Sequence, residues 1–160
     1  MATKSLFLLR HAKAINGGVL IPDQDRPLSD SGVKDAKRLG SYLSKKSFDF
    51  DLILSSPAIR AITTAQIVAN KLGYKQKHLA VEKCLYEADV EVMLKLISSV
   101  PKKVDTLMIV GHNPSIYALA SSLSGEPISM STCALIELTL EIKHWDQVLT
   151  IKASKFSVLN

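Results

Sequence analysis

The sequence lacks the patterns that mark several large enzyme classes. Its 7 glycines include one adjacent pair, and no GxGxxG or P-loop pattern occurs, which argues against nucleotide binding of those kinds. It has no GxSxG for a hydrolase serine. It also has no HExxH or paired-cysteine spacing for zinc, so we expect no metal site. Its apolar runs are strand-sized, far below the ~20 residues of a membrane helix.

Cysteine and clustered charge are also scarce. The 2 cysteines, Cys84 and Cys133, form no CxxC pair and have apolar neighbours, so we expect buried structural thiols. The formal net charge is +5, but the lysines come singly or in pairs without interleaved aromatics. We therefore expect no nucleic-acid partner, whereas a mild positive balance would attract an anionic substrate.

Hydrophobic residues make up 47% of the chain, and no low-complexity tract interrupts it, so we expect a folded protein. The sequence leads straight into its first expected strand and leaves no room for a secretory signal. We expect a soluble, cytoplasmic protein with no membrane partner.

Strand-like and helix-like segments alternate along the chain, which predicts an α/β fold with parallel central strands. Ser56 and Asn113 each precede a proline and are predicted to cap helices. A C-terminal hairpin would make the sheet mixed, so the expected fold class is a three-layer α/β/α arrangement. The expected strands are 6–9, 51–54, a weak strand near 79–85, 106–110, 134–140 and its hairpin partner 148–151. The expected helices begin at Ser29 or Asp30, Ser56, Asp89 and Asn113, and end near 45, 72, 97 and 124.

Three of the expected strands end in residues that carry chemistry. The first ends in Arg10 and His11, the second is followed by Arg60 in the first turn of a helix, and the fourth ends before His112. Each residue alone fits a bland role in a loop or on the surface. A cation in the first turn of a helix is slightly disfavoured by the helix dipole, however, unless an anion binds there as well. In a parallel sheet the four side chains would converge on one crevice beyond the strand ends.

The segments "LLRHAKA", "DRPLSDSG", "SSPAIRAITTA" and "VGHNPSI" resemble the histidine phosphatase superfamily, with its phosphoglycerate-mutase-like fold. The short chain resembles the SixA-like phosphohistidine phosphatase branch of that superfamily. The resemblance runs from residue 6 to about 122, and we treat 1–160 as one domain. Ala12 departs from the mutase pattern, which has glycine after the histidine, and the inserted helical lid is missing.

The resemblance implies that His11 is the nucleophile of a covalent phosphohistidine intermediate. It implies that Arg10 and Arg60 grip the phosphoryl oxygens and that His112 donates to them, with no metal or cofactor. Arg26 either reaches the phosphate or forms a loop salt bridge. Glu87 is either the general acid or an exposed loop carboxylate.

The remaining candidates are weaker. Asp89 is favoured as the cap of its helix, Lys13 as a solvated lysine, and His78 and His144 as surface residues, while Trp145 should cover the core edge. A phosphorylated protein is the expected substrate. A small phosphate ester, a mutase reaction and a non-catalytic phospho-ligand binding module remain alternatives. The missing lid counts against a mutase, which must shield its intermediate from water.

Overall fold

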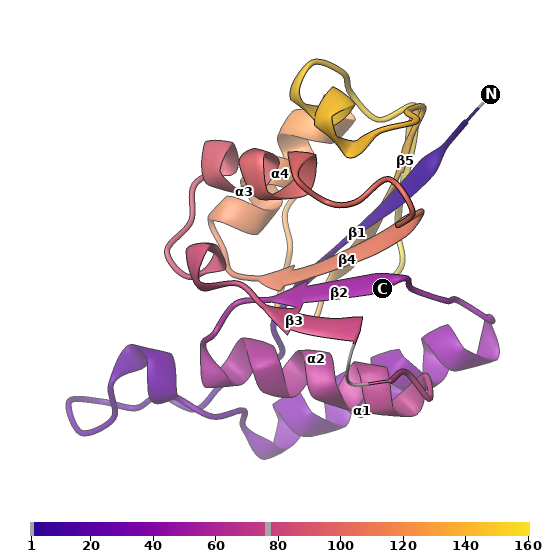
Figure 1. Cartoon of the computed structure of the whole chain (residues 1–160). Helices are drawn as coiled ribbons and strands as arrows, with labels where there is room; N and C mark the ends of the chain where they lie inside the picture. Colours follow the sequence, from indigo (N-terminus) through magenta and orange to yellow (C-terminus); the bar gives the residue numbers. More distant parts are fainter. Residues whose placement is uncertain (1, 76–77) are drawn as a thin grey trace.

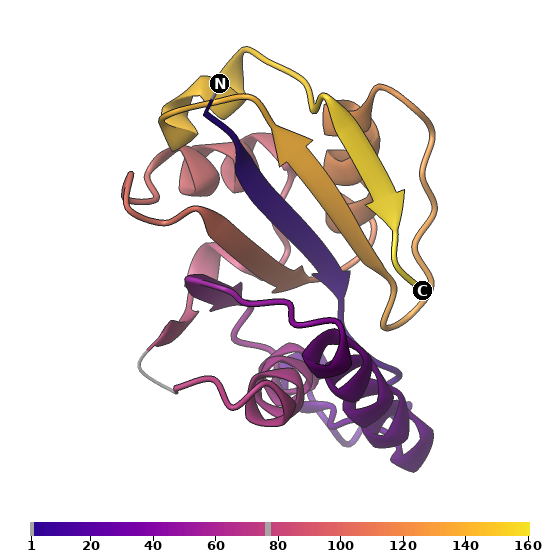
Figure 2. The same ribbon diagram turned by 90° about the vertical axis from the view of Figure 1, so that its right-hand side faces the viewer.

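The computed structural model describes residues 2–75 and 78–160, which fold around one mixed sheet (Figures 1 and 2). Within these residues the sheet has the strand order β3-β2-β4-β1-β5-β6. Strands β1 to β4 run parallel, whereas β5 pairs antiparallel with both β1 and β6. The strands are β1 (Lys4–Arg10), β2 (Leu52–Ser55), β3 (Leu79–Val81), β4 (Thr106–Gly111), β5 (Leu135–Leu140) and β6 (Lys155–Val158).

Helices cover both faces of the sheet, which confirms the three-layer α/β/α class. Figure 1 shows α1 and α2 on one face and α3 and α4 on the other. The helices are α1 (Asp30–Lys45), α2 (Ile59–Lys71), α3 (Val90–Ser98) and α4 (Ser115–Ser124). Short 3₁₀ turns lie at η1 (Asp23–Asp25), η3 (Lys83–Leu85) and η4 (Trp145–Leu149).

The two hydrophobic cores meet across β1. Leu6 and Leu8 belong to the core under α3 and α4, whereas Phe7 and Leu9 belong to the core under α1 and α2. All four are at most 1% exposed, as expected for a central strand that is buried on both faces. Strand β1, which ends in Arg10, is therefore packed against a hydrophobic core on each face and hydrogen-bonded to a neighbouring strand along each edge.

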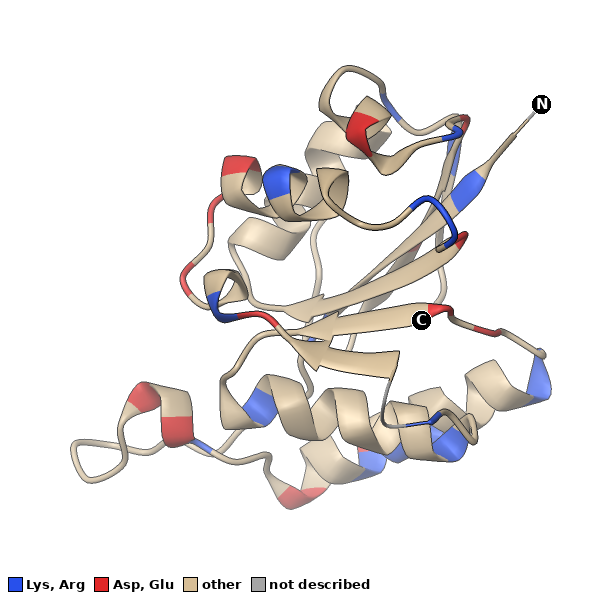
Figure 3. Ribbon diagram, in the orientation of Figure 1, with Lys and Arg blue, Asp and Glu red and all other residues tan. Residues whose placement is uncertain are grey.

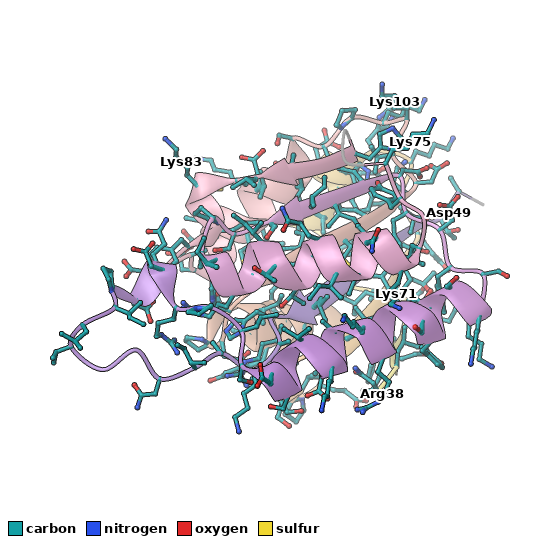
Figure 4. The ribbon with its side chains drawn as sticks, turned by 90° about the horizontal axis from the view of Figure 1, so that it is seen from below. Arg38, Asp49, Lys71, Lys75, Lys83 and Lys103 are labelled. Carbon is teal, nitrogen blue, oxygen red and sulfur yellow. The ribbon has the colours of Figure 1, made fainter. Side chains whose placement is uncertain are left out.

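Helices α1 and α2 lie close together because Gly40 offers no side chain at their contact. A Cβ at Gly40 would lie 2.6 Å from Cβ of Lys71, too close without a shift of one helix. Figure 4 shows Lys71 between the two helices. The described residues include no helix with the length and apolar character needed to cross a membrane.

The predicted N-caps are confirmed at two helices and wrong at the other two. Ser29 and Asp89 cap α1 and α3 through their side chains. Ser56 does not cap α2, which begins three residues later, and Asn113 does not cap α4, whose N-cap is Pro114. The amide of Asn113 instead donates to the Met130 carbonyl at 2.8 Å.

The predicted hairpin partner 148–151 is also wrong, because the partner of β5 is β6. Residues Trp145–Leu149 form η4, which buries Trp145 and Val148 together. The indole Nε1 donates to the Val104 carbonyl at 2.7 Å, so the side chain needs this turn to reach its acceptor. The apolar residues that suggested a strand at 148–151 begin with Val148, which is buried as part of this turn.

The cysteine prediction is half right. Cys133 is buried, but Cys84 is exposed. Cys84 lies in η3, a turn that directs Leu85 into the core and so leaves its neighbour at the surface.

Candidate active site

Three neighbouring strand ends meet at one cavity of about 280 Å³. Arg10 ends β1 and His11 follows it, His112 follows β4, and Arg60 lies in the first turn of α2 after β2. Because β1, β4 and β2 are parallel neighbours, their carboxyl ends lie at the same edge. The ring centroids of His11 and His112 are 5.1 Å apart, so the predicted convergence is confirmed. The cavity is lined by Arg10, His11, Lys13, Ala14, Arg26, Arg60, His112, Asn113 and Thr132.

A larger cavity of about 370 Å³ lies between α1 and the C-terminal segment. Its walls include Leu39, Tyr42 and Leu159 but neither histidine. The smaller, more polar cavity is therefore the candidate active site.

The His11 side chain is arranged as a neutral nucleophile. Its Nδ1 lies 2.7 Å from the Ala12 carbonyl, an acceptor that requires the proton on Nδ1 and leaves a lone pair on Nε2. Burial, together with the charges of Arg60 and Arg10, lowers the pKa of His11 to about 4, although the bond to the Ala12 carbonyl partly opposes them. The imidazole is therefore uncharged at pH 7.

Thr64 braces the nucleophile against the helix that carries Arg60. Its Oγ1 accepts from the Ala12 N–H at 3.0 Å and donates to the Arg60 carbonyl at 2.7 Å. The residue is fully buried. This brace lies four residues after Arg60 on the same face of α2, a spacing that could have revealed it in the sequence.

His112 takes its orientation from Ser56. The Ser56 Oγ accepts from the Ala58 N–H and lies 2.7 Å from Nε2 of His112. The described residues place no other acceptor near this hydroxyl, so its proton goes to Nε2 and the ring proton of His112 sits on Nδ1. Burial lowers the pKa of His112 to about 3, helped by repulsion between the two rings when both are protonated and by the charge of Arg60. The surroundings of His112 therefore favour a neutral ring that donates through its N–H.

Within the described part of the chain, three buried donors at this cavity have no protein acceptor. They are Nε of Arg10, Nε of Arg60 and Nδ1 of His112. Arg10 uses another guanidinium nitrogen to donate to the Met130 carbonyl at 3.1 Å. Buried donors are rarely left without an acceptor, and an anion with several oxygens would satisfy this set.

Sequence reasoning missed Asp23 and Tyr86. The Asp23 carboxylate forms ion pairs with the guanidinium groups of Arg60 and Arg26, each at 3.0 Å. It also accepts a hydrogen bond from the Tyr86 hydroxyl at 2.6 Å. These contacts, with the Tyr86 bond the strongest, hold the pKa of Asp23 well below its usual range. The acidic η1 that carries Asp23 lies on the segment that projects past the start of α2 (Figure 3). Tyr86 also packs edge-on against His112, with ring centroids 5.7 Å apart.

The structure separates the weaker candidates. Arg26 makes the predicted loop salt bridge and also lines the cavity, while its contact with a phosphate stays a prediction. Glu87 is exposed and is not among the cavity-lining residues, and its role stays a prediction. Lys13 lines the cavity but is exposed, and His78 and His144 lie on the surface as predicted.

Comparison with known proteins defines the class that this fold and cavity indicate. A family model described as histidine phosphatase superfamily (branch 1) matches residues 6–103. The chain belongs to the histidine phosphatase superfamily.

Within that superfamily the chain is similar to SixA proteins. It is 23% identical over 139 residues to phosphohistidine phosphatase SixA of Escherichia coli, which covers 85% of each chain. The solved structure of the protein histidine phosphatase SixA with tungstate superposes with a TM-score of 0.80 at 20% identity, covering 96% of this chain and 93% of that one. An uncharacterized protein of Arabidopsis thaliana is 30% identical over 158 residues, 93% of this chain and 72% of that protein.

Proposed function

We propose that the protein is a phosphatase that acts on protein phosphohistidine through a covalent intermediate on His11. The observation that carries the choice of substrate is the make-up of the cavity wall. Among the described residues that line it, six of the nine carry basic or imidazole side chains and none carries a carboxyl group. A site of this kind can hold a phosphoryl group but has no acid ready to protonate a leaving alkoxide.

The reaction would use the groups in the positions described. The Nε2 lone pair of His11 forms a bond to phosphorus as the bond to the leaving group breaks and takes its electron pair away. Arg10, Arg60 and His112 donate to the phosphoryl oxygens, whose charge is spread over all three. Water then attacks the phosphohistidine, inorganic phosphate leaves, and His11 is restored.

A phosphohistidine substrate suits this wall because its P–N bond is weak and its leaving imidazole can arrive already protonated. An alkyl ester needs a proton donor, a step that is typically worth about 10²–10⁴-fold in rate. The similarity to SixA proteins supports the same choice. Between β1 and α1 the described residues form no helix longer than η1, and a cavity without a helical lid there would suit a protein-bound phosphoryl group.

The test is a panel of a phosphohistidine protein, an aryl phosphate and sugar phosphates, assayed side by side. We expect the phosphohistidine protein to be the preferred substrate, with turnover that survives a strong chelator. His11→Ala should abolish both turnover and the acid-labile phosphoenzyme, whereas His144→Ala, at an exposed histidine, should retain both. Preference for a sugar phosphate would instead support a small-molecule phosphatase, and binding without turnover of any substrate would support a phospho-ligand binding module.

Glu87 provides a separate test of the substrate assignment. Glu87→Gln should slow alkyl phosphate hydrolysis much more than phosphohistidine hydrolysis if Glu87 swings in as an acid. Equal losses on both substrates would refute that division, and no loss on either would remove Glu87 from the site.

A further inference from the structure

We propose that Asp23 is the positioning residue of the phosphate clamp: it fixes the direction in which Arg60 presents its free N–H groups, and its charge lowers the affinity for phosphate. The proposal rests on the proposed function of the same cavity. Asp23 does not line that cavity, so it would act on a bound phosphoryl group through Arg60 and Arg26, which do.

Asp23 accepts hydrogen bonds from both terminal nitrogens of the Arg60 guanidinium. One terminal nitrogen of Arg60 donates to the Asp23 main-chain carbonyl at 2.7 Å, and the other donates to Oδ2 at 3.0 Å. The guanidinium is rigid and planar, so fixing both terminal nitrogens also fixes the direction of Nε–H. That Nε is the buried donor without an acceptor among the described residues.

The Asp23 carboxylate is itself held from two more sides. Its Oδ1 accepts from Nε of Arg26 at 3.1 Å and forms an ion pair with a terminal nitrogen of the same guanidinium at 3.0 Å, and Oδ2 accepts from the Tyr86 hydroxyl at 2.6 Å. The Arg60 side chain is only 7% exposed. A carboxylate that accepts three hydrogen bonds from Arg60, Arg26 and Tyr86 has little freedom to turn, so it can hold the arginine it binds.

The same carboxylate places a negative charge beside an anion site. Asp23 is 54% exposed, so solvent weakens its repulsion of phosphate without removing it. Replacing it with asparagine should therefore have two opposite effects. Phosphate binding becomes tighter because the charge is gone, and turnover becomes slower because Arg60 is no longer held in one orientation.

The experiment compares Asp23→Asn with the wild type in turnover and in affinity for inorganic phosphate. We expect kcat to fall about tenfold, since small misplacement of a catalytic group is costly. We expect the Kd for phosphate, measured by calorimetry without substrate, to fall roughly threefold. Tyr86→Phe keeps the ring against His112 and should lower kcat by less. Asp25→Asn removes the same charge from the same turn, at an exposed side chain, and should change neither quantity.

A readout that needs no turnover comes from the arginine Nε–H signals of isotope-labelled protein. The chain has only 4 arginines, so the Arg60 signal can be assigned with Arg60→Lys, and exposed Arg38 is an internal reference. We expect a sharp Arg60 signal in the wild type that shifts on addition of phosphate and is broad in Asp23→Asn. A sharp signal in the variant, or a Kd for phosphate that rises in parallel with the loss of kcat, would overturn the proposal. A wild type that binds phosphate but turns over no substrate would refute the proposed function, while the signal and the Kd would still decide the role of Asp23.

Discussion

Acidification should destabilise the protein through buried His11 and half-buried His112, and His11→Gln should remove a measurable part of that effect. The pKa of His11 lies at about 4 in the folded protein, against an ordinary value of 6.5. Between these two values the unfolded chain binds a proton that the folded chain does not bind, so stability falls as the pH falls through this window. From pH 7 to pH 4.5 this single group costs between about 2 and 3 kcal/mol of unfolding free energy.

The assay is urea unfolding at the two pH values, followed by fluorescence of the single tryptophan, Trp145, which is 1% exposed. Buffers without phosphate or sulfate are required, because an anion in the cavity would itself stabilise the folded state. His11→Gln should shrink the difference between pH 7 and pH 4.5 by about 2 kcal/mol or more, since removing His11 also relieves His112. His144→Gln, at an exposed position, is the control and should keep the wild-type difference. An unchanged difference in His11→Gln would refute a buried neutral His11.

Three further outcomes follow from the same contacts. The acid limb of kcat/KM should fall near pH 4, well below 6.5, because the neutral form of His11 is lost only there; a limb near 6.5 would contradict it. Ser56→Ala removes the hydroxyl that fixes the tautomer of His112, and should lower kcat/KM about tenfold while circular dichroism shows an unchanged fold. Lys4→Met removes the ammonium that donates to the Lys102 carbonyl at 2.7 Å and to the Val104 carbonyl at 2.8 Å, although Val104 keeps its bond from Trp145; it should cost about 1–3 kcal/mol of unfolding free energy in urea, with wild-type KM.

The sequence predicted the alternation of strands and helices well, because each central strand is buried on both faces and each helix on one. It also predicted the convergence of Arg10, His11, Arg60 and His112, since parallel strands end at one edge and the resemblance covered those positions. The errors fall where a local pattern has two physical uses. A serine before a proline can cap a helix, or it can form a hydrogen bond with a side chain from elsewhere in the fold. Ser56 does the second, because its hydroxyl bonds His112, more than 50 residues away in the sequence.

The contacts of Asp23 and Tyr86 could not be predicted from local patterns. The Tyr86 hydroxyl bonds directly to Asp23, 63 positions away, and neither residue shows a spacing or cap preference that marks it. Tyr86 stands directly before Glu87, the predicted candidate for the general acid, so the loop that the sequence singled out does contact the cavity through Tyr86, while the role of Glu87 stays a prediction. Long-range polar contacts of this kind depend on tertiary packing, which local sequence does not encode.

The position of β1 in the sheet has a consequence for biosynthesis. This strand is made first, but its partners are β4 and β5, for example Leu6 with Leu107 and Leu138, about 100 and 130 residues later. Closing loops of this length is slow compared with forming local helices. During synthesis the apolar strand β1 therefore stays unpaired until most of the domain has emerged from the ribosome. A partly synthesised chain has no assembled cavity, so we expect the nascent protein to need protection from aggregation before it can gain any activity.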